Sequence, residues 1–152
     1  MYQFAKESVE ERIITIKLLQ TLNAKPDFNN MISQIEDTIS RMKIRPNNYT
    51  LLSLMHIKQS LGLQVDVEGL KQKHKSTMFG NWYWGNEGYF MFENSIQETL
   101  LGYKILKSSK ADERLLTKVR NYFFEQRKDG KWRNTYESSL ILETLMPDLL
   151  KD

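Results

Sequence analysis

Two stretches of this chain align without a gap: SVEERIITIKLL at residues 8–19 and SIQETLLGYKIL at residues 95–106. Each begins with Ser-x-x-Glu ahead of an apolar run, a pattern typical of a capping box at the start of a helix. The sequence therefore predicts that Ser8 and Ser95 are helix N-caps. A repeated start of this kind indicates architecture and assigns no chemistry.

Apolar periodicity predicts seven helices and no strand. The predicted ranges are 8–22, 27–43, 48–61, 66–75, 94–107, 112–127 and 134–146. Asn48 and Asn134 are the predicted starts that continue the series, and the interval of roughly 40 residues is typical of stacked helix-loop-helix units. Gly62 is expected to end the third helix, and Pro147 is expected to stop the last one.

The first, third, fifth and seventh predicted helices are richer in apolar residues than the helices between them. This alternation predicts an inner and an outer layer of stacked antiparallel hairpins. An irregular helical bundle would produce a similar pattern, so both arrangements stay open. In either case the fold class is all-α, and 152 residues with 40% hydrophobic content predict a single domain over residues 1–152.

Composition narrows the classes of function. A net charge of +3 is small beside 22 basic and 19 acidic side chains, so the surface is mixed and argues against a dedicated nucleic-acid binder. The chain contains no cysteine, which excludes disulfides, a thiol nucleophile and cysteine-ligated metals. No uninterrupted apolar run approaches 18 residues, so we expect no direct membrane insertion.

A predicted loop at residues 79–93 is the segment that helix packing explains least. Within it, residues 82–92 hold six of the seventeen aromatic residues of the chain, and residues 80–88 hold three glycines that disfavour a regular helix. The loop could plug one end of the helical shell, or it could offer a stacking platform for a sugar, a peptide or a partner domain. The candidate binding residues are Trp82, Tyr83, Trp84, Glu87 and Tyr89 in this loop, and Trp132 in a later turn.

The turn before Trp132 reads QRKDGKW at residues 126–132 and has the form Gln-x-x-Asp-Gly-x-Trp that recurs in alpha/alpha toroids. Taken with the WYW start of the aromatic loop, NSIQETLL at 94–101, YFFEQR at 122–127 and WRNT at 132–135, it resembles the closing part of the toroid domain of bacterial alpha-macroglobulins. The resemblance is clearest over residues 81–146. It implies a partial alpha/alpha toroid related to the thioester domains of alpha-macroglobulins and complement proteins.

The resemblance also implies a function. It points to a non-catalytic structural or interaction module without a cofactor, whose partners are other proteins or neighbouring domains of a longer chain. The whole protein would then act in protease inhibition or surface defence outside the cytoplasm. Family members that trap proteases covalently carry a Cys-x-Glu-Gln thioester, and this chain has no cysteine, so covalent capture is excluded for these 152 residues.

Two or three hairpins of a complete toroid have no counterpart in this sequence. We therefore expect an exposed apolar edge along the helices predicted at 8–22 and 27–43, and a homodimer that buries this edge is one consequence.

Two alternatives to the alpha-macroglobulin module stay open. A peptide-binding helical repeat would line a groove with polar anchors from the more apolar helices. A carbohydrate-active toroid enzyme would need a pair of carboxylates, for which Glu87, Glu93 and Glu98 are the candidates beside the aromatic loop.

The two histidines give no metal-binding pattern. His56 is predicted to be a hydrogen-bonded residue between helical layers, and His74 lies in the run KQKHK, which is expected to form the solvated last turn of the fourth helix.

Overall fold

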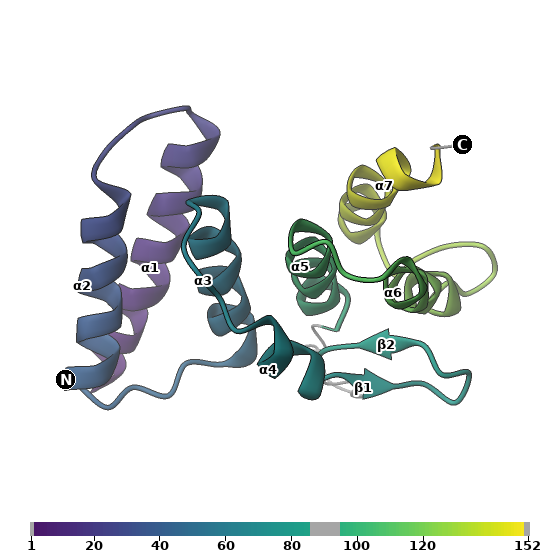
Figure 1. Ribbon diagram of the computed structural model, residues 1–152, viewed down its shortest axis with the longest axis horizontal. Helices are drawn as coiled ribbons and strands as arrows, with labels where there is room; N and C mark the ends of the chain where they lie inside the picture. The colour runs from purple at the N-terminus through teal and green to yellow at the C-terminus, as the bar shows by residue number, and fades with distance from the viewer. Residues whose placement is uncertain (1, 86–94, 151–152) are drawn as a thin grey trace. The chain divides into compact units, whose positions relative to one another are not determined.

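The computed structural model describes residues 2–85 and 95–150, and the chain divides into two compact units, Met1–Val65 and Asp66–Asp152. The described residues form seven helices and one pair of very short strands, so the all-α prediction is confirmed (Figure 1). The prediction of a single domain over residues 1–152 stays a prediction beside this division.

The first unit consists of three helices: α1 (Tyr2–Thr21), α2 (Phe28–Arg41) and α3 (Asn48–Ser60). α1 and α2 form an antiparallel hairpin, and α1 contacts both other helices (Figure 1). Isoleucine dominates the core, because its branched side chain fills space with little rotamer freedom to lose. The buried residues of this core cluster are Val9, Ile13, Ile16, Ile32, Ile35, Ile44, Leu54 and Ile57.

The same six-residue connection links successive helices of this unit and leads out of it: LNAKPD at 22–27, MKIRPN at 42–47 and LGLQVD at 61–66. Its second residue adopts a positive φ: 58° for Asn23, 51° for Lys43 and 79° for Gly62. The amide of its third residue donates to a carbonyl five residues earlier at 2.9–3.0 Å, which is the Schellman arrangement. The side chain of its last residue caps the next helix; these residues are Asp27, Asn47 and Asp66.

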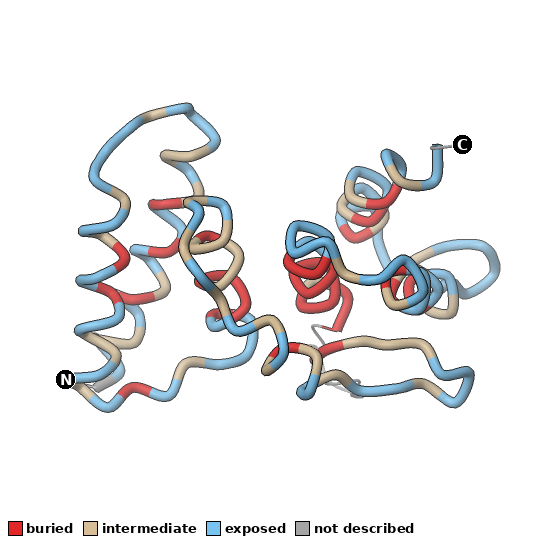
Figure 2. The backbone as a smooth tube through the Cα atoms, in the orientation of Figure 1, coloured by how far each residue is buried: buried red, intermediate tan, exposed pale blue. Residues whose placement is uncertain are grey.

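The second unit contains α4 (Val67–Gln72), β1 (Lys75–Ser76), β2 (Trp82–Tyr83), α5 (Ser95–Ser108), α6 (Glu113–Glu125) and α7 (Thr135–Leu149). The two strands pair antiparallel as a hairpin. α5 is the central helix, because it contacts α4, α6, α7 and β2, and ten of its fourteen residues are buried. Figure 2 shows this burial as a nearly continuous red helix.

The predicted cap at Ser8 is wrong. α1 already runs from Tyr2, so Ser8 lies in its second turn. The preceding residues Gln3 to Glu7 include good helix formers and neither glycine nor proline, so the helix extends through a pattern that elsewhere starts one. Ser95 is the first described residue of α5, and its hydroxyl accepts a hydrogen bond from Tyr122 Oη at 2.6 Å.

The prediction that the chain has no strand is also wrong, and the fourth helix is shorter than the predicted range 66–75. α4 ends at Gln72, and Lys75 and Ser76 pair with Tyr83 and Trp82. The hairpin forms because Thr77 and Asn81 close a turn in which Gly80 adopts a φ of +82°. Periodicity could not indicate strands of two residues.

Pro147 does not stop the last helix. α7 begins with the predicted cap Asn134, whose side chain accepts from the Glu137 amide at 2.8 Å, and it continues through Pro147 to Leu149. The proline removes one helical hydrogen bond near an exposed end. Asp148, the next residue, is held by hydrogen bonds from Tyr103 and Lys107 of α5, and these tertiary contacts keep the last turn helical.

Candidate functional site

Trp84 is the buried centre of the second unit. Its side chain is 4% exposed, and its indole Nε1 donates to the Leu70 carbonyl at 3.0 Å. The Trp84 backbone is bonded twice to the Thr99 hydroxyl of α5, at 3.0 and 3.1 Å. The ring lies so close to Gly102 that a Cβ at that position would approach Trp84 Cε3 to 2.6 Å. Trp84 is therefore a packing residue between α4, the hairpin and α5.

Trp82 and Tyr83 are half-buried and stack on other rings of the chain. The Trp82 ring lies parallel to the His74 ring at 3.4 Å between centroids, and Lys118 Nζ lies 5.9 Å from its centroid. Tyr83 stacks on Tyr122 of α6 at 4.8 Å. Both aromatic residues thus have intramolecular stacking partners on at least one side.

Trp132 is fixed in the turn between α6 and α7. Its Nε1 donates to the Phe123 carbonyl at 2.7 Å, and the Arg127 guanidinium lies 5.1 Å from the ring centroid. Arg127 in turn donates to the carbonyl of Gly130, which has a φ of +76°. The turn is therefore built around the tryptophan, which closes the C-terminal end of α6.

The structure brings Trp82, Tyr83 and Trp84 together in one hairpin and places Trp132 in the turn after α6. Glu87 and Tyr89 lie outside the described residues, as does Glu93. The contacts of the four described aromatics favour the packing interpretation of this segment, while their role in binding stays a prediction.

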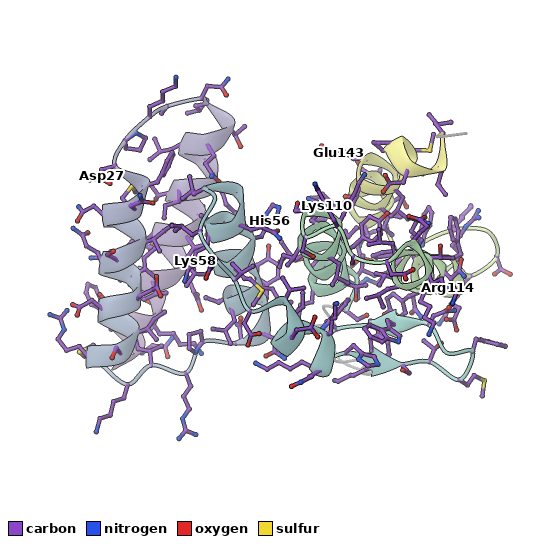
Figure 3. All side chains as sticks on the ribbon, viewed as in Figure 1. Asp27, His56, Lys58, Lys110, Arg114 and Glu143 are labelled. Carbon is purple, nitrogen blue, oxygen red and sulfur yellow. The ribbon has the colours of Figure 1, made fainter. Side chains whose placement is uncertain are left out.

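The acidic and imidazole side chains of residues 2–85 and 95–150 form no cluster with metal-ligand spacing. No group of three or more His, Asp or Glu there could hold a metal ion. Glu98 is 2% exposed in the first turn of α5, so it lies in the helical core. His74 Nδ1 contacts the Lys71 carbonyl at 2.5 Å and the ring stacks on Trp82, so it is not in a solvated helical turn. His56 lies on α3 (Figure 3).

A polar network that no sequence pattern indicated joins α5, α6 and α7. The fully buried Tyr103 donates its hydroxyl to Asp148 and accepts from Arg120 at 2.9 Å. Lys107 pairs with Asp148, and Arg120 pairs with Glu113. Residues that meet across 17 to 45 positions leave no local signal, so only the fold could reveal them.

The network shifts the titration of its members. Burial, with the hydrogen bond to Asp148, raises the pKa of Tyr103 to about 12. For Asp148, burial acts to raise the pKa, but hydrogen bonds from Lys107 and Tyr103 outweigh it and hold the pKa below its usual value. Tyr103 therefore stays neutral and Asp148 charged near neutral pH, which is the pairing that locks α7 onto α5.

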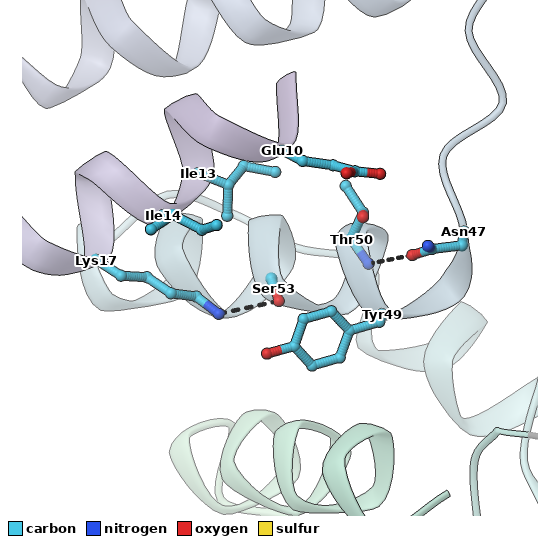
Figure 4. Close-up of a pocket in the computed structure, with 8 residues that line it drawn as sticks. All are labelled: Glu10, Ile13, Ile14, Lys17, Asn47, Tyr49, Thr50 and Ser53. Atoms are coloured by element: carbon cyan, nitrogen blue, oxygen red, sulfur yellow. Dashed lines mark hydrogen bonds between the residues drawn. The ribbon is translucent and has the colours of Figure 1, made fainter. Parts of the chain in front are cut away.

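A pocket of about 330 Å³ opens between α1 and α3 of the first unit (Figure 4). Ile13 and Ile14 form its apolar wall. Lys17 Nζ donates to Ser53 Oγ at 3.0 Å and lies 5.3 Å from the centroid of the Tyr49 ring. The other lining residues are Glu10, Asn47 and Thr50.

One helix of each unit also carries an exposed apolar stripe. On α1 the stripe consists of Phe4, Ile14, Leu18 and Leu22, with exposures of 56–76%. On α7 it consists of Tyr136, Leu142, Met146, Leu149 and Leu150. Of the apolar residues expected to surround the first helix with neighbours, only Val9, Ile13 and Ile16 are buried. The α1 stripe lies on one of the two helices of the predicted exposed edge. On α2, the other helix of that edge, no large hydrophobic residue between Phe28 and Arg41 is exposed, so this part of the prediction is wrong.

Comparisons with known proteins give no relative: no family model, no curated protein and no solved structure matches the chain. Among the described residues, no helix has the length and apolar character needed to cross a membrane.

Proposed function

We propose that this chain is a non-catalytic protein-interaction module. The observation that carries the proposal is the pair of exposed apolar stripes on α1 and α7, because in stacked helical folds such a face is covered by the next helix or by a partner. The described aromatic residues of the hairpin support the same reading, since they are engaged in packing within the second unit.

The α1 stripe is the more informative of the two surfaces. Ile14, Leu18 and Leu22 recur at four-residue steps, and Phe4 precedes Ile14 by ten residues, so all four lie on one side of a helix whose other side is buried against α2 and α3. Burying one such leucine or phenylalanine on association would contribute roughly 1.5–3 kcal/mol before the cost of association. The stripe can therefore support binding of a helical partner or a second copy of the chain.

From the resemblance to bacterial alpha-macroglobulins, we propose that this module belongs to a longer extracytoplasmic protein that inhibits proteases or defends the cell surface. In that setting the helices would form part of an alpha/alpha toroid, and the apolar stripes would pack on neighbouring hairpins or domains. We propose this setting on the motifs at residues 81–146.

Self-association through α1 is the direct test. Light scattering of the purified chain at increasing concentration should show a dimer, and Leu18→Glu with Leu22→Glu should return it to a monomer. The matched control is Ser33→Glu with Gln34→Glu, which adds the same charge to the exposed face of α2 and should leave the dimer intact. A wild-type monomer at high concentration would count against the stripe as a self-association surface.

A further inference from the structure

The pocket between α1 and α3 has opposite charges at its two ends. Figure 4 shows the Glu10 carboxylate at one end, beside Thr50 and Asn47, and the Lys17 ammonium at the other, beside Ser53 and the Tyr49 hydroxyl. Between them lies the apolar wall of Ile13 and Ile14. Such a pocket is complementary to an elongated molecule with a cation at one end, an anion at the other and an apolar side.

Lys17 is held in place before any ligand arrives. Its ammonium donates to Ser53 Oγ at 3.0 Å, and Ser53 is 1% exposed on α3. The same ammonium lies 5.3 Å from the centroid of Tyr49, whose ring forms a side of the pocket. A cation fixed by a buried hydroxyl and a ring loses little side-chain freedom when it binds an anion, which favours binding of a carboxylate at this end.

The α3 side of the pocket is polar and is also ordered. The Asn47 side chain accepts from the Thr50 amide at 2.8 Å as the N-cap of α3, and Thr50 is 7% exposed. Together with Glu10 on α1, these residues make an end that is rich in acceptors. An ammonium group is the natural complement of this end.

The length of the pocket limits the ligand. Glu10 and Lys17 are seven residues apart on α1, a separation of about 10.5 Å along the helix axis. An extended peptide of three residues spans roughly 10 Å. The volume of about 330 Å³ falls in the lower part of the range for small-molecule pockets, roughly 300–1,000 Å³.

We propose that this pocket binds a short peptide with free termini, its amino group at Glu10, its carboxylate at Lys17 and an apolar side chain against Ile13 and Ile14. This site shares Ile14 with the α1 stripe proposed above as an association surface, but its two charged ends, Glu10 and Lys17, are not members of the stripe. The affinity for such a peptide would depend on both charged ends of the pocket, Glu10 and Lys17.

The test uses the tripeptide Ala-Leu-Ala and its acetylated, amidated form, which has the same side chains and no terminal charges. Titrated into the isotope-labelled full chain, the free peptide should cause saturable amide shifts in α1 and α3. Capping should weaken binding at least about tenfold, because two charge-assisted contacts are lost. Equal affinity for both forms, saturable shifts confined to other helices, or no saturable shift at millimolar peptide would each overturn the proposal.

Variants separate the two ends of the pocket. Lys17→Met retains the aliphatic stem and Glu10→Gln retains the shape, and each should weaken the free peptide about tenfold while leaving the capped peptide unchanged. Arg12→Met, which removes a charge from another face of α1, should leave both affinities unchanged. If a variant unfolds, the comparison of free and capped peptide on the wild-type chain still decides the question.

Discussion

Replacing Gly102 by alanine should destabilise the second unit, although alanine is the better helix former. Gly102 lies inside α5, where glycine to alanine ordinarily stabilises a helix by about 1 kcal/mol. Here the added Cβ would lie 2.6 Å from Trp84 Cε3 and 2.8 Å from Cζ3, well inside contact distance. The ring has no easy escape, because Nε1 is bonded to Leu70 and the Trp84 backbone is bonded to Thr99.

The size of the effect follows from these opposing contributions. Overpacking a well-filled core costs typically about 1–3 kcal/mol. Subtracting the gain in helix propensity of about 1 kcal/mol leaves a net loss of roughly 0–2 kcal/mol, and the fixed Trp84 places the expectation near 1 kcal/mol. We therefore expect Gly102→Ala to lower the free energy of unfolding, whereas the same change at a helical glycine without close neighbours raises it.

Urea unfolding followed by tryptophan fluorescence is the suitable assay, because Trp82, Trp84 and Trp132 all lie in the second unit. The decisive comparison is the cycle with Trp84→Leu. That change alone should cost several kcal/mol, about 3–5 by analogy with other large-to-small core changes. In its background Gly102→Ala should become stabilising. Two results would contradict the assignment: Gly102→Ala stabilises the wild-type chain, or its destabilising effect persists in the Trp84→Leu background. In either case the close contact with Trp84 is not the reason for glycine at position 102.

Three further changes test other features of the fold. Asn134→Ala removes the cap of α7 and should cost about 1 kcal/mol of unfolding free energy in urea, whereas Asn134→Asp should cost much less. Lys43→Gly relieves a φ of 51° and should stabilise the first unit by about 0.5–1 kcal/mol, measured by circular dichroism during unfolding. The pKa of Tyr103 is raised from 10.0 to about 12, so the folded state holds this proton more tightly and stability should fall as pH rises from 10 toward 12. Tyr103→Phe should flatten that decline, and an unchanged pH profile would contradict the assignment.

Local signals in the sequence were sufficient for most helices. Asn134 and Gly62 have the predicted capping roles, and α3 is capped by Asn47, one residue before the predicted start. These caps depend on neighbours within one helical turn, so a sequence pattern of a few residues is enough to predict them. Ser8 shows the limit of such patterns, because residues on its N-terminal side extend the helix past it.

The contacts that define the second unit could not be predicted in this way. Trp84 meets residues of α4 and α5 that are 14 and 15 positions away, and Tyr103 meets Asp148 across 45 positions. The composition of the aromatic segment indicated that something other than a helix lay there. Which ring is buried depends on the space that Gly102 leaves, and this follows only from the packed structure.

One readable signal was nevertheless overlooked, namely the repeated connection at residues 22–27, 42–47 and 61–66. Each connection has an apolar residue first, then a residue with left-handed backbone, a short spacer, and an Asp or Asn that caps the next helix. The helices that follow begin at Phe28, Asn48 and Val67, about 20 residues apart.

Because the same backbone turn joins α1 to α2, α2 to α3 and α3 to α4, the geometry of the first unit is set by its connections as much as by its isoleucine core. The second unit departs from this rule. The connection after α5 keeps the left-handed residue, Lys110 with a φ of 59°, but reaches its cap Asp112 two residues sooner. In the second unit, the helices are oriented by the hairpin, by Trp84 and by the Tyr103–Asp148 contact. Changes to connections should therefore perturb the first unit most, and changes to single aromatic contacts the second.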